Sequence, residues 1–287
     1  MSALDIEHLR GWIGRTQEKS DTVSPRLVES FNALFDAESG IAAGDIAPLG
    51  IHWCLAPDIA PMHVLGPDGH PARGGFLPPV PLQRRMWAGG RMQSPGDIRV
   101  GDIVTRRSRI EDVTEKSGRS GPLVFVTVRH DYVTPRGVAL GERQDIVYRD
   151  RETGGTGRTA PTTGPGPEPI RAEHSRQIKA SPTLLFRYSA LTFNGHRIHY
   201  DLPYAMDVEQ YPGLVFHGPL QATCLMRLAA EIAGTPLASF DYRSVAPLYA
   251  GGEISLHAAE SQAGLDLWVA DASHNVTMKA TAVLCAG

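Results

Sequence analysis

The sequence has few cysteines, no long apolar run and little net charge, and each of these absences excludes a class of protein. Its three cysteines, Cys54, Cys224 and Cys285, lie far apart in a chain of 287 residues. They form no Cys-x-x-Cys pair, so neither a disulfide framework nor a zinc site is predicted. No apolar run reaches the roughly eighteen residues that span a bilayer. The N-terminus also lacks the basic start and apolar core of a signal peptide, and we expect a cytoplasmic protein without membrane contact.

Charge and composition exclude further partners. The formal net charge of -3 provides no general attraction to nucleic acid. A hydrophobic content of 42% with 21% charged residues is typical of a globular protein that buries a substantial core. The Gly-Gly-Thr-Gly run at 154–157 lacks the lysine and the following helix of a phosphate-binding loop. No cofactor is therefore expected.

The chain divides at residues 152–170, which are rich in glycine, proline and threonine and have almost no apolar side chain. This composition predicts a linker between a first half, residues 1–151, and a second half, residues 171–287. Ser24 and Pro25 begin a predicted helix in the first half, and Gly40 and Gly44 end it. A second helix is predicted from Pro219. The predicted strands are Ile103–Ile110, Leu123–His130, Ala139–Tyr148, Glu253–Ala259, Leu265–Ala270 and Val276–Cys285.

Residues 46–91 show no long periodicity and are predicted to form a long loop. Within it, Gly-Pro-Asp-Gly-His-Pro at 66–71 is interpreted as a turn. Around the strands, Ile-Arg-Val-Gly-Asp-Ile at 98–103 is echoed by Leu-Tyr-Ala-Gly-Gly-Glu-Ile at 248–254. The echo and the linker predict two copies of one α+β unit, each with a long helix on an antiparallel sheet.

Residues 185–230 concentrate side chains that can hold or move a proton beside a helix start. Asn194, His196, Arg197 and His199 fall within six positions, among aromatic and small residues. Gly218 then precedes Pro219 and a long apolar run. Backbone N–H groups at the start of a helix stabilise negative charge that develops on an oxygen. This combination predicts an active site in the second half.

Two motifs in this stretch resemble those of the MaoC-like, (R)-specific enoyl-CoA hydratases. Ser-Ala-Leu-Thr-Phe-Asn-Gly-His-Arg-Ile-His at 189–199 is similar to the family pattern Ser-Gly-Asp-x-Asn-Pro-Ile-His. Val-Phe-His-Gly-Pro-Leu-Gln-Ala at 215–222 resembles the His-Gly that opens the central helix of the family's hotdog fold.

The first half extends the likeness, since 66–71 and Gly-Gly-Phe-Leu-Pro-Pro-Val-Pro-Leu at 74–82 resemble the N-terminal domain of a double-hotdog subfamily. That subfamily includes mitochondrial 3-hydroxyacyl-thioester dehydratases and bacterial hydratases of mesaconyl-C4-CoA, 3-methylfumaryl-CoA and itaconyl-CoA. The resemblance implies a double hotdog and an acyl-CoA substrate, and we expect no bound metal. A further homodimer is compatible with it.

In the family, an aspartate and a histidine share one water, and the histidine aligns with His199. The aspartate aligns with Asn194, and the family's asparagine and proline align with His196 and Arg197. An amide cannot serve as a base, so the strict aspartate–histidine mechanism does not transfer. We expect His199, as an imidazole that titrates near neutrality, to be the general base. Asn194 would orient the water, and His196 would be a second proton carrier or a support.

The Gly218 N–H is expected to bind the enolate oxygen of a thioester. His217 is expected to pack at the helix entry, and Tyr188 to contact the substrate with it. Two other interpretations of the histidines stay open. The His-x-x-His pair could be part of a metal site, although no third ligand at a recognisable spacing accompanies it. The histidines could also be structural residues of a loop, which the adjacent His-Gly-Pro disfavours.

Several arginines surround the predicted site, and a substrate with a second carboxylate needs one planar cation near its acyl end. Arg197 is the first candidate because it stands where the family has a proline, and Arg187 is the second. Others would contact coenzyme A phosphates or solvent; this group includes Arg84, Arg85, Arg91 and Arg243. We therefore expect a hydratase of a short dicarboxylic acyl-CoA. The alternatives are a 3-hydroxyacyl-thioester dehydratase of fatty-acid synthesis, with an apolar tunnel, and a hotdog thioesterase or acyl-CoA binding module.

Overall fold

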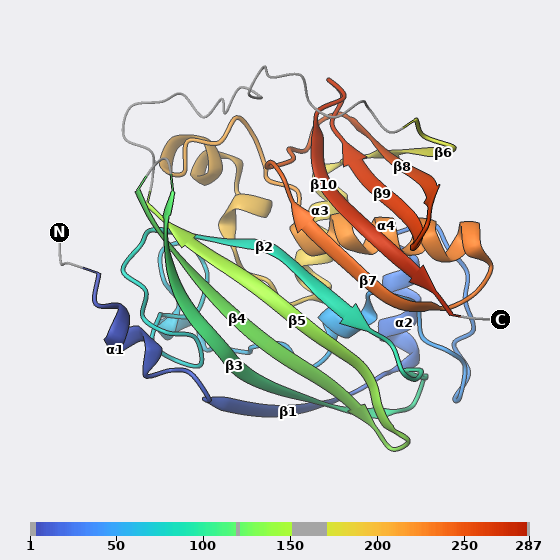
Figure 1. Ribbon diagram of the computed structural model, residues 1–287, viewed down its shortest axis with the longest axis horizontal. Coiled ribbons are helices and arrows are strands. Elements are labelled where there is room, and N and C mark those ends of the chain that lie inside the picture. The colour runs from blue at the N-terminus through green and yellow to red at the C-terminus, as the bar shows by residue number, and fades with distance from the viewer. Residues whose placement is uncertain (1–3, 119–120, 151–170, 286–287) are drawn as a thin grey trace.

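One antiparallel sheet of ten strands runs through both halves of the chain in the computed structural model, which describes residues 4–118, 121–150 and 171–285 (Figure 1). The strand order is β1-β3-β4-β5-β2-β7-β10-β9-β8-β6. The strands are β1 (Thr16–Thr22), β2 (Arg84–Gln93), β3 (Ile103–Gly118), β4 (Gly121–Thr134), β5 (Gly137–Arg149), β6 (His174–Lys179), β7 (Leu237–Ser244), β8 (Glu253–Ser261), β9 (Gly264–Ala270) and β10 (Val276–Leu284). The predicted α+β class is confirmed.

Every predicted strand is present, but four strands were not predicted as such. β1 and β6 lie at the edges of the sheet and are mostly polar, so their sequences carry little strand signal. β7 follows directly after a helix and was not predicted. β2 was placed in the long loop, although its start was expected to be extended.

The two halves of the sheet join where β2 pairs with β7, with Gly90 opposite Tyr242. A Cβ atom on Gly89 would lie 2.5 Å from the carbonyl oxygen of Tyr242, and one on Gly90 would lie 2.5 Å from that of Arg143. Only glycine therefore fits at this seam. The same two glycines weaken the strand pattern of the sequence and explain why β2 was missed.

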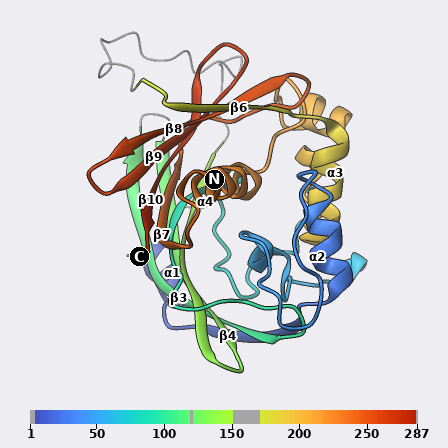
Figure 2. The same cartoon turned by 90° about the vertical axis from the view of Figure 1, so that its right-hand side faces the viewer.

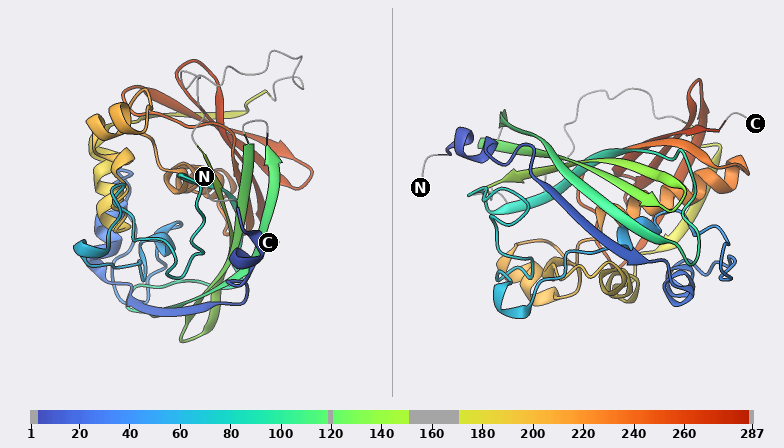
Figure 3. Two further views of the ribbon diagram at one scale, coloured as in Figure 1. Left: turned by 90° about the vertical axis from the view of Figure 1, so that its left-hand side faces the viewer. Right: turned by 90° about the horizontal axis from the view of Figure 1, so that it is seen from below.

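The helix α4 (Gly218–Ala233) lies in the concave face of the sheet, as Figures 2 and 3 show. Pro219 stands in its first turn, where a missing N–H costs nothing, and Gly234 ends it with φ 64°. The helices α2 (Pro25–Asn32) and α3 (Pro182–Leu191) lie on the side of α4 away from the sheet (Figure 3). The sheet, α4 and this helix pair form three layers.

The first half departs from the predicted plan because none of its described helices is a long helix on the sheet. The helix α2 spans 8 residues and ends at Asn32, well before the predicted end at Gly40. Asp36, which follows the helix, takes a positive φ of 47°. The helix packs against α3. Residues of the long loop, among them Val80 and Leu82, pack on the first-half strands. The long helix that was expected in the first half is therefore absent from its described residues, although each half contributes strands to the sheet as predicted.

The shorter elements are α1 (Ile6–Arg10), η1 (Ile51–Cys54), η2 (Met62–Val64), η3 (Arg197–His199) and η4 (Tyr204–Val208). Among the described residues, no helix is both long and apolar enough to cross a membrane. The predicted linker at 152–170 lies outside the described residues. The boundaries at 151 and 171 stay predictions.

The core position of α4 leads to a test of stability. Leu220 is fully buried in the main core, whereas Leu202 is 46% exposed. We expect Leu220→Ala to lower the free energy of unfolding by about 2–5 kcal/mol, because the lost contacts leave a cavity. The matched Leu202→Ala should change it by less than about 1 kcal/mol. Denaturant unfolding of both variants checks this, and equal losses would contradict the assignment of α4 to the core.

Candidate active site

A cavity of about 1440 Å³ is lined by residues of both halves. The second half contributes α3, the loop after it and the start of α4. The first half contributes residues around the 66–71 turn, β2, and parts of β4 and β5. Small-molecule sites commonly measure about 300–1,000 Å³. The larger volume indicates an extended ligand.

The loop after α3 forms a tight turn that carries Asn194. Phe193 takes φ 52°, which is uncommon for a bulky side chain, and the Asn194 N–H donates to the Ser189 carbonyl at 2.8 Å. The Asn194 side-chain oxygen then accepts the backbone N–H of His196 at 3.0 Å. This oxygen therefore holds the turn.

His199 lies at the end of η3, where the two predicted motifs meet. Its Nδ1 donates to the Val215 carbonyl at 2.7 Å, and the Val215 N–H donates to the Ile198 carbonyl at 2.9 Å. Because a carbonyl only accepts, the proton of the neutral ring lies on Nδ1. The Nε2 atom keeps a free lone pair, as a general base requires. His199 lines the cavity and is 7% exposed.

The ionisation of His199 differs from the expectation of a near-neutral titration. Burial lowers its pKa to about 4, and the charge of His70 acts in the same direction. The hydrogen bond to Val215 opposes both effects without cancelling them. His199 is therefore neutral at pH 7, which is the protonation state of a base.

His217 and Gly218 connect this histidine to the start of α4. His217 is the N-cap residue, and its ring stacks on His199 with a centroid separation of 3.7 Å. Its Nε2 lies 2.9 Å from the Ser189 hydroxyl, and Tyr188 packs edge-on at 5.0 Å. Gly218 lines the cavity with an N–H in the first turn of the helix, where no partner within the helix is available.

The 66–71 segment is a turn, as predicted, but it is also docked onto the second-half loop. The backbone N–H of Arg197 donates to the Asp68 carbonyl at 2.9 Å. Gly69 has φ 86°, and a Cβ atom there would lie 2.0 Å from the Gly195 carbonyl oxygen. Arg197 also donates through Nη1 to the Pro67 carbonyl at 3.0 Å. The two loops are thus in direct backbone contact.

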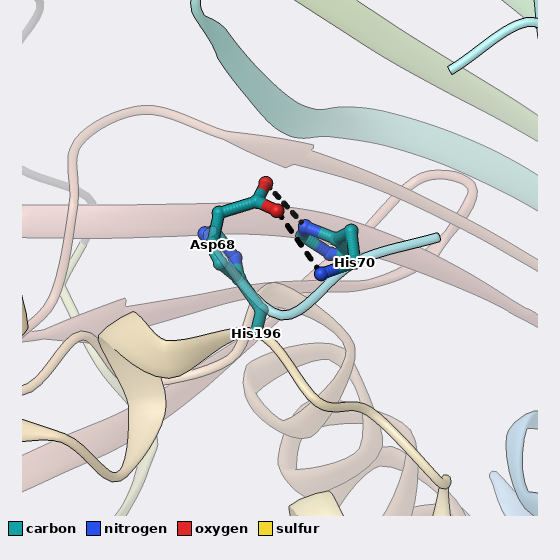
Figure 4. A group of neighbouring side chains, drawn as sticks. All are labelled: Asp68, His70 and His196. Atoms are coloured by element: carbon teal, nitrogen blue, oxygen red, sulfur yellow. Dashed lines mark hydrogen bonds and ion pairs between the residues drawn. The ribbon is translucent and has the colours of Figure 1, made fainter. Parts of the chain in front are cut away.

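This docking brings Asp68 and His70 beside His196 (Figure 4). One Asp68 oxygen lies 3.0 Å from His70 Nδ1, and the other accepts the His70 backbone N–H at 3.0 Å. The His70 ring lies 4.1 Å from that of His196, which in turn lies 5.4 Å from His199. Sequence reasoning missed Asp68 and His70; the Asp-x-His spacing inside the turn was the available signal.

Burial and mutual charge set the protonation of this group. Burial lowers the pKa of His70 to about 4, helped by Arg85 and opposed by Asp68. Burial also lowers the pKa of His196, with contributions from His70 and His199. Burial alone would raise the pKa of Asp68, but its hydrogen bonds to His70 hold it below the usual value. At pH 7 the carboxylate is charged and both rings are neutral.

One ligand atom from each of Asp68, His70 and His196 lies within 4.8 Å of the others, so these residues could hold a cation. Only His196 of the predicted His-x-x-His pair belongs to this group, and its other two members come from the first half. His199 is not part of this group. The Nδ1 of His70 already bonds to Asp68, which leaves only its Nε2 for another partner.

Two of the predicted substrate-binding arginines are held by other groups. Arg197 donates to Asp201 from Nε at 2.9 Å and from Nη2 at 2.7 Å, and its guanidinium lies over Tyr204. Arg187 bonds to the Ala33 carbonyl at 3.4 Å and does not line the cavity. Arg187 thus joins α3 to the end of α2, and Arg197 holds the two docked loops together.

Arg84 and Arg85 both line the cavity but differ in their partners. Arg84 donates to the Glu209 carbonyl at 2.6 Å, and its guanidinium lies over the Tyr211 ring. No carboxylate among residues 4–118, 121–150 and 171–285 forms an ion pair with Arg85. Its charge lowers the pKa of both His70 and His196, which places it close to the imidazoles. Arg85 is thus available to an anionic ligand.

Known proteins share both the sequence and the fold. Residues 50–250 match the family model described as hydroxyacyl-thioester dehydratase type 2. The chain is 44% identical to the mesaconyl-C(4)-CoA hydratase of Chloroflexus aurantiacus over 83% of this chain and 84% of the relative.

Two solved structures show the fold. A MaoC-like dehydratase superposes with a TM-score of 0.71 at 13% identity, covering 97% of this chain and all of that structure. A Mycobacterium tuberculosis protein with a double hotdog fold superposes with a TM-score of 0.56 at 13% identity, covering 94% and 96%. The predicted double hotdog is confirmed. The chain belongs to the hydroxyacyl-thioester dehydratase type 2 family.

Proposed function

We propose that this protein adds water reversibly to the double bond of an enoyl thioester of coenzyme A, and that the acyl group is a short unsaturated dicarboxylic acid. The observation that carries the proposal is the lone pair of His199 Nε2, in a cavity that the Gly218 N–H also lines. A base and an oxyanion donor at one site are what water addition to a thioester needs. The name of the Chloroflexus aurantiacus relative supports the same reaction class.

In the hydration direction, His199 Nε2 takes a proton from water while the water oxygen bonds to the β-carbon. Charge develops on the thioester oxygen, and the Gly218 N–H donates to it. The imidazolium of His199 then returns its proton to the α-carbon, which restores the neutral ring. A Cβ atom on Gly218 would approach no protein atom closer than 3.8 Å. The protein's own packing therefore leaves room beside this amide for a ligand.

Arg85 supports the choice of a dicarboxylic acyl group. Arg197, the first candidate from the sequence, is committed to Asp201, so we assign the second carboxylate of the substrate to Arg85 instead. A guanidinium binds a carboxylate through two parallel hydrogen bonds. The acyl groups that fit are those of mesaconyl-, itaconyl- and methylfumaryl-CoA.

The alternative is dehydration of longer 3-hydroxyacyl thioesters, which the family description favours. This reaction uses the same groups in reverse and differs in the acyl pocket. Polar side chains such as Lys19, Arg106 and Gln144 line the first-half part of the cavity, whereas a fatty chain prefers an apolar tunnel. A thioesterase is disfavoured because Glu231, the late acid of α4, pairs with Arg176 and does not line the cavity.

Substitution of His199 tests the base. His199→Ala should lower kcat for hydration by about 10²–10⁴-fold, since the proton acceptor is lost. The exposed His63 offers a matched control, and His63→Ala should keep the wild-type rate. Loss of enoyl-thioester absorbance, without release of free thiol, measures the reaction. An unchanged rate in His199→Ala would contradict the role of His199, and thiol release would indicate a thioesterase.

The acidity of His199 predicts the pH dependence. Because its pKa is about 4, the base is unprotonated above that value and protonated below it. The wild-type kcat/KM, which reports groups of the free enzyme, should therefore hold between about pH 5 and 7 and fall as the pH decreases through about 4. A rate profile in overlapping buffers checks this. A fall centred near the ordinary histidine pKa of about 6.5 would contradict it.

Arg85→Gln tests the acyl group. We expect kcat/KM for mesaconyl-C4-CoA to fall about 10- to 100-fold, the loss of a charged hydrogen-bonded pair. The value for crotonyl-CoA, which has no second carboxylate, should stay within about threefold. Arg187→Gln, outside the cavity, serves as the control for loss of one positive charge. Equal losses of kcat/KM for both substrates would show that Arg85 does not bind the second carboxylate.

A further inference from the structure

The proposed hydration leaves one requirement of the attacking water unmet. A water molecule attacks through an oxygen lone pair, so both of its hydrogens must be directed to acceptors elsewhere. His199 Nε2 accepts one of them. Asn194 was expected to orient the water, but its side-chain oxygen is held in the backbone turn, where it accepts the N–H of His196 at 3.0 Å. One of its two lone pairs is used in this bond, and the amide nitrogen only donates.

The first half supplies a suitable acceptor in His70, which lines the same cavity. The Asp68 carboxylate can only accept, so the proton of the neutral His70 ring lies on Nδ1, 3.0 Å from Asp68. Nε2 then keeps its lone pair. His70 and His199 are thus anchored in the same way, each through Nδ1 on a protein oxygen. The rings of both lie next to that of His196.

His196 itself fits this role less well. Among the hydrogen bonds of the described residues, its ring makes none, so nothing fixes which nitrogen carries the proton. Its ring lies 4.1 Å from that of His70 and 5.4 Å from that of His199. It therefore packs against both anchored imidazoles.

We propose that His70, positioned by Asp68, is a second catalytic residue that accepts a hydrogen bond from the attacking water. The inference deepens the proposed hydration and depends on it. The attacking water needs a second acceptor besides His199. The proposal assigns this acceptor to a residue of the first half instead of to Asn194. The active site is then completed by the first-half turn at 66–71.

The proton balance closes with this arrangement. One hydrogen of the water goes to His199 Nε2 as the oxygen bonds to the β-carbon, and His199 later gives it to the α-carbon. The other hydrogen stays on the oxygen and becomes the hydroxyl hydrogen of the product. It remains hydrogen-bonded to His70 Nε2 throughout. Both imidazoles end in the state in which they began, and Asp68 stays ionised.

The first test replaces His70. His70→Ala should lower kcat for hydration by about 10²-fold or more, while KM stays within about threefold, because the water and not the thioester loses a partner. His63→Ala changes an exposed histidine of the same segment and should match the wild type. A His70→Ala enzyme that is as fast as His63→Ala would overturn the proposal.

The second test replaces Asp68 with its isosteric amide, which also serves if His70→Ala does not fold. The carboxylate of Asp68 fixes the proton of His70 on Nδ1, whereas an amide can also donate to Nδ1 and so place the proton on Nε2. Asp68→Asn should therefore lower kcat by about tenfold while KM stays within about threefold. The acid limb should stay near pH 4, because His199 sets it. A wild-type kcat in Asp68→Asn, or a loss that appears in KM instead of kcat, would overturn the positioning role of Asp68.

Three outcomes separate the hypotheses. A wild-type enzyme that hydrates no enoyl thioester would refute the proposed function itself. An active wild type with an equally active His70→Ala would refute only this inference. Activity that is lost on treatment with a chelator and restored by Zn²⁺ would assign Asp68, His70 and His196 to a metal site instead, and would overturn the role of His70 as a free acceptor.

Discussion

The backbone contact between the 66–71 turn and the loop at 193–200 is the constraint on which the site depends. Gly69 and Gly195 approach so closely that neither position has space for a side chain. Arg197 holds the same contact from its side by bonding to Pro67 and Asp201. Through this contact the first half presents His70 to a cavity whose proposed base and oxyanion donor belong to the second half. The architecture thus makes one site out of two halves.

Burial gives the imidazoles of this site a common chemical character. His70, His199 and His217 each sit where desolvation lowers the pKa, and each lies near another histidine. Neutral rings whose Nδ1 is bonded to oxygen are acceptors at Nε2, so His70 and His199 favour a ligand that donates two hydrogens. Water meets that description because it has two hydrogens to donate, whereas a hydroxyl group has one and an enoyl thioester has none. The electrostatics and the proposed chemistry therefore agree.

The features that could be predicted from the sequence are those that depend on a local pattern of residues. The strands of alternating apolar residues, the start of α4 at Gly218 and the position of His199 between two motifs were all readable from neighbours in the chain. The seam at Gly89 could not be predicted in this way, because a glycine indicates close contact between two strands only when the partner strand is known. Asp68 and His70 were missed for the same reason: their turn is ordinary by itself, and its partner lies over a hundred positions away.

The two halves of the chain differ in structure, and this difference sets the number of ligands that each chain is expected to bind. Within the described residues, only α4 in the second half is a long helix that points its N-terminus into the cavity, while loops cover the sheet of the first half. At the proposed site each chain would therefore hold one catalytic centre, although its sheet is built from two halves. A tight-binding analogue of the enolate would saturate it at one equivalent per chain. Any cooperativity in substrate binding would have to arise between chains.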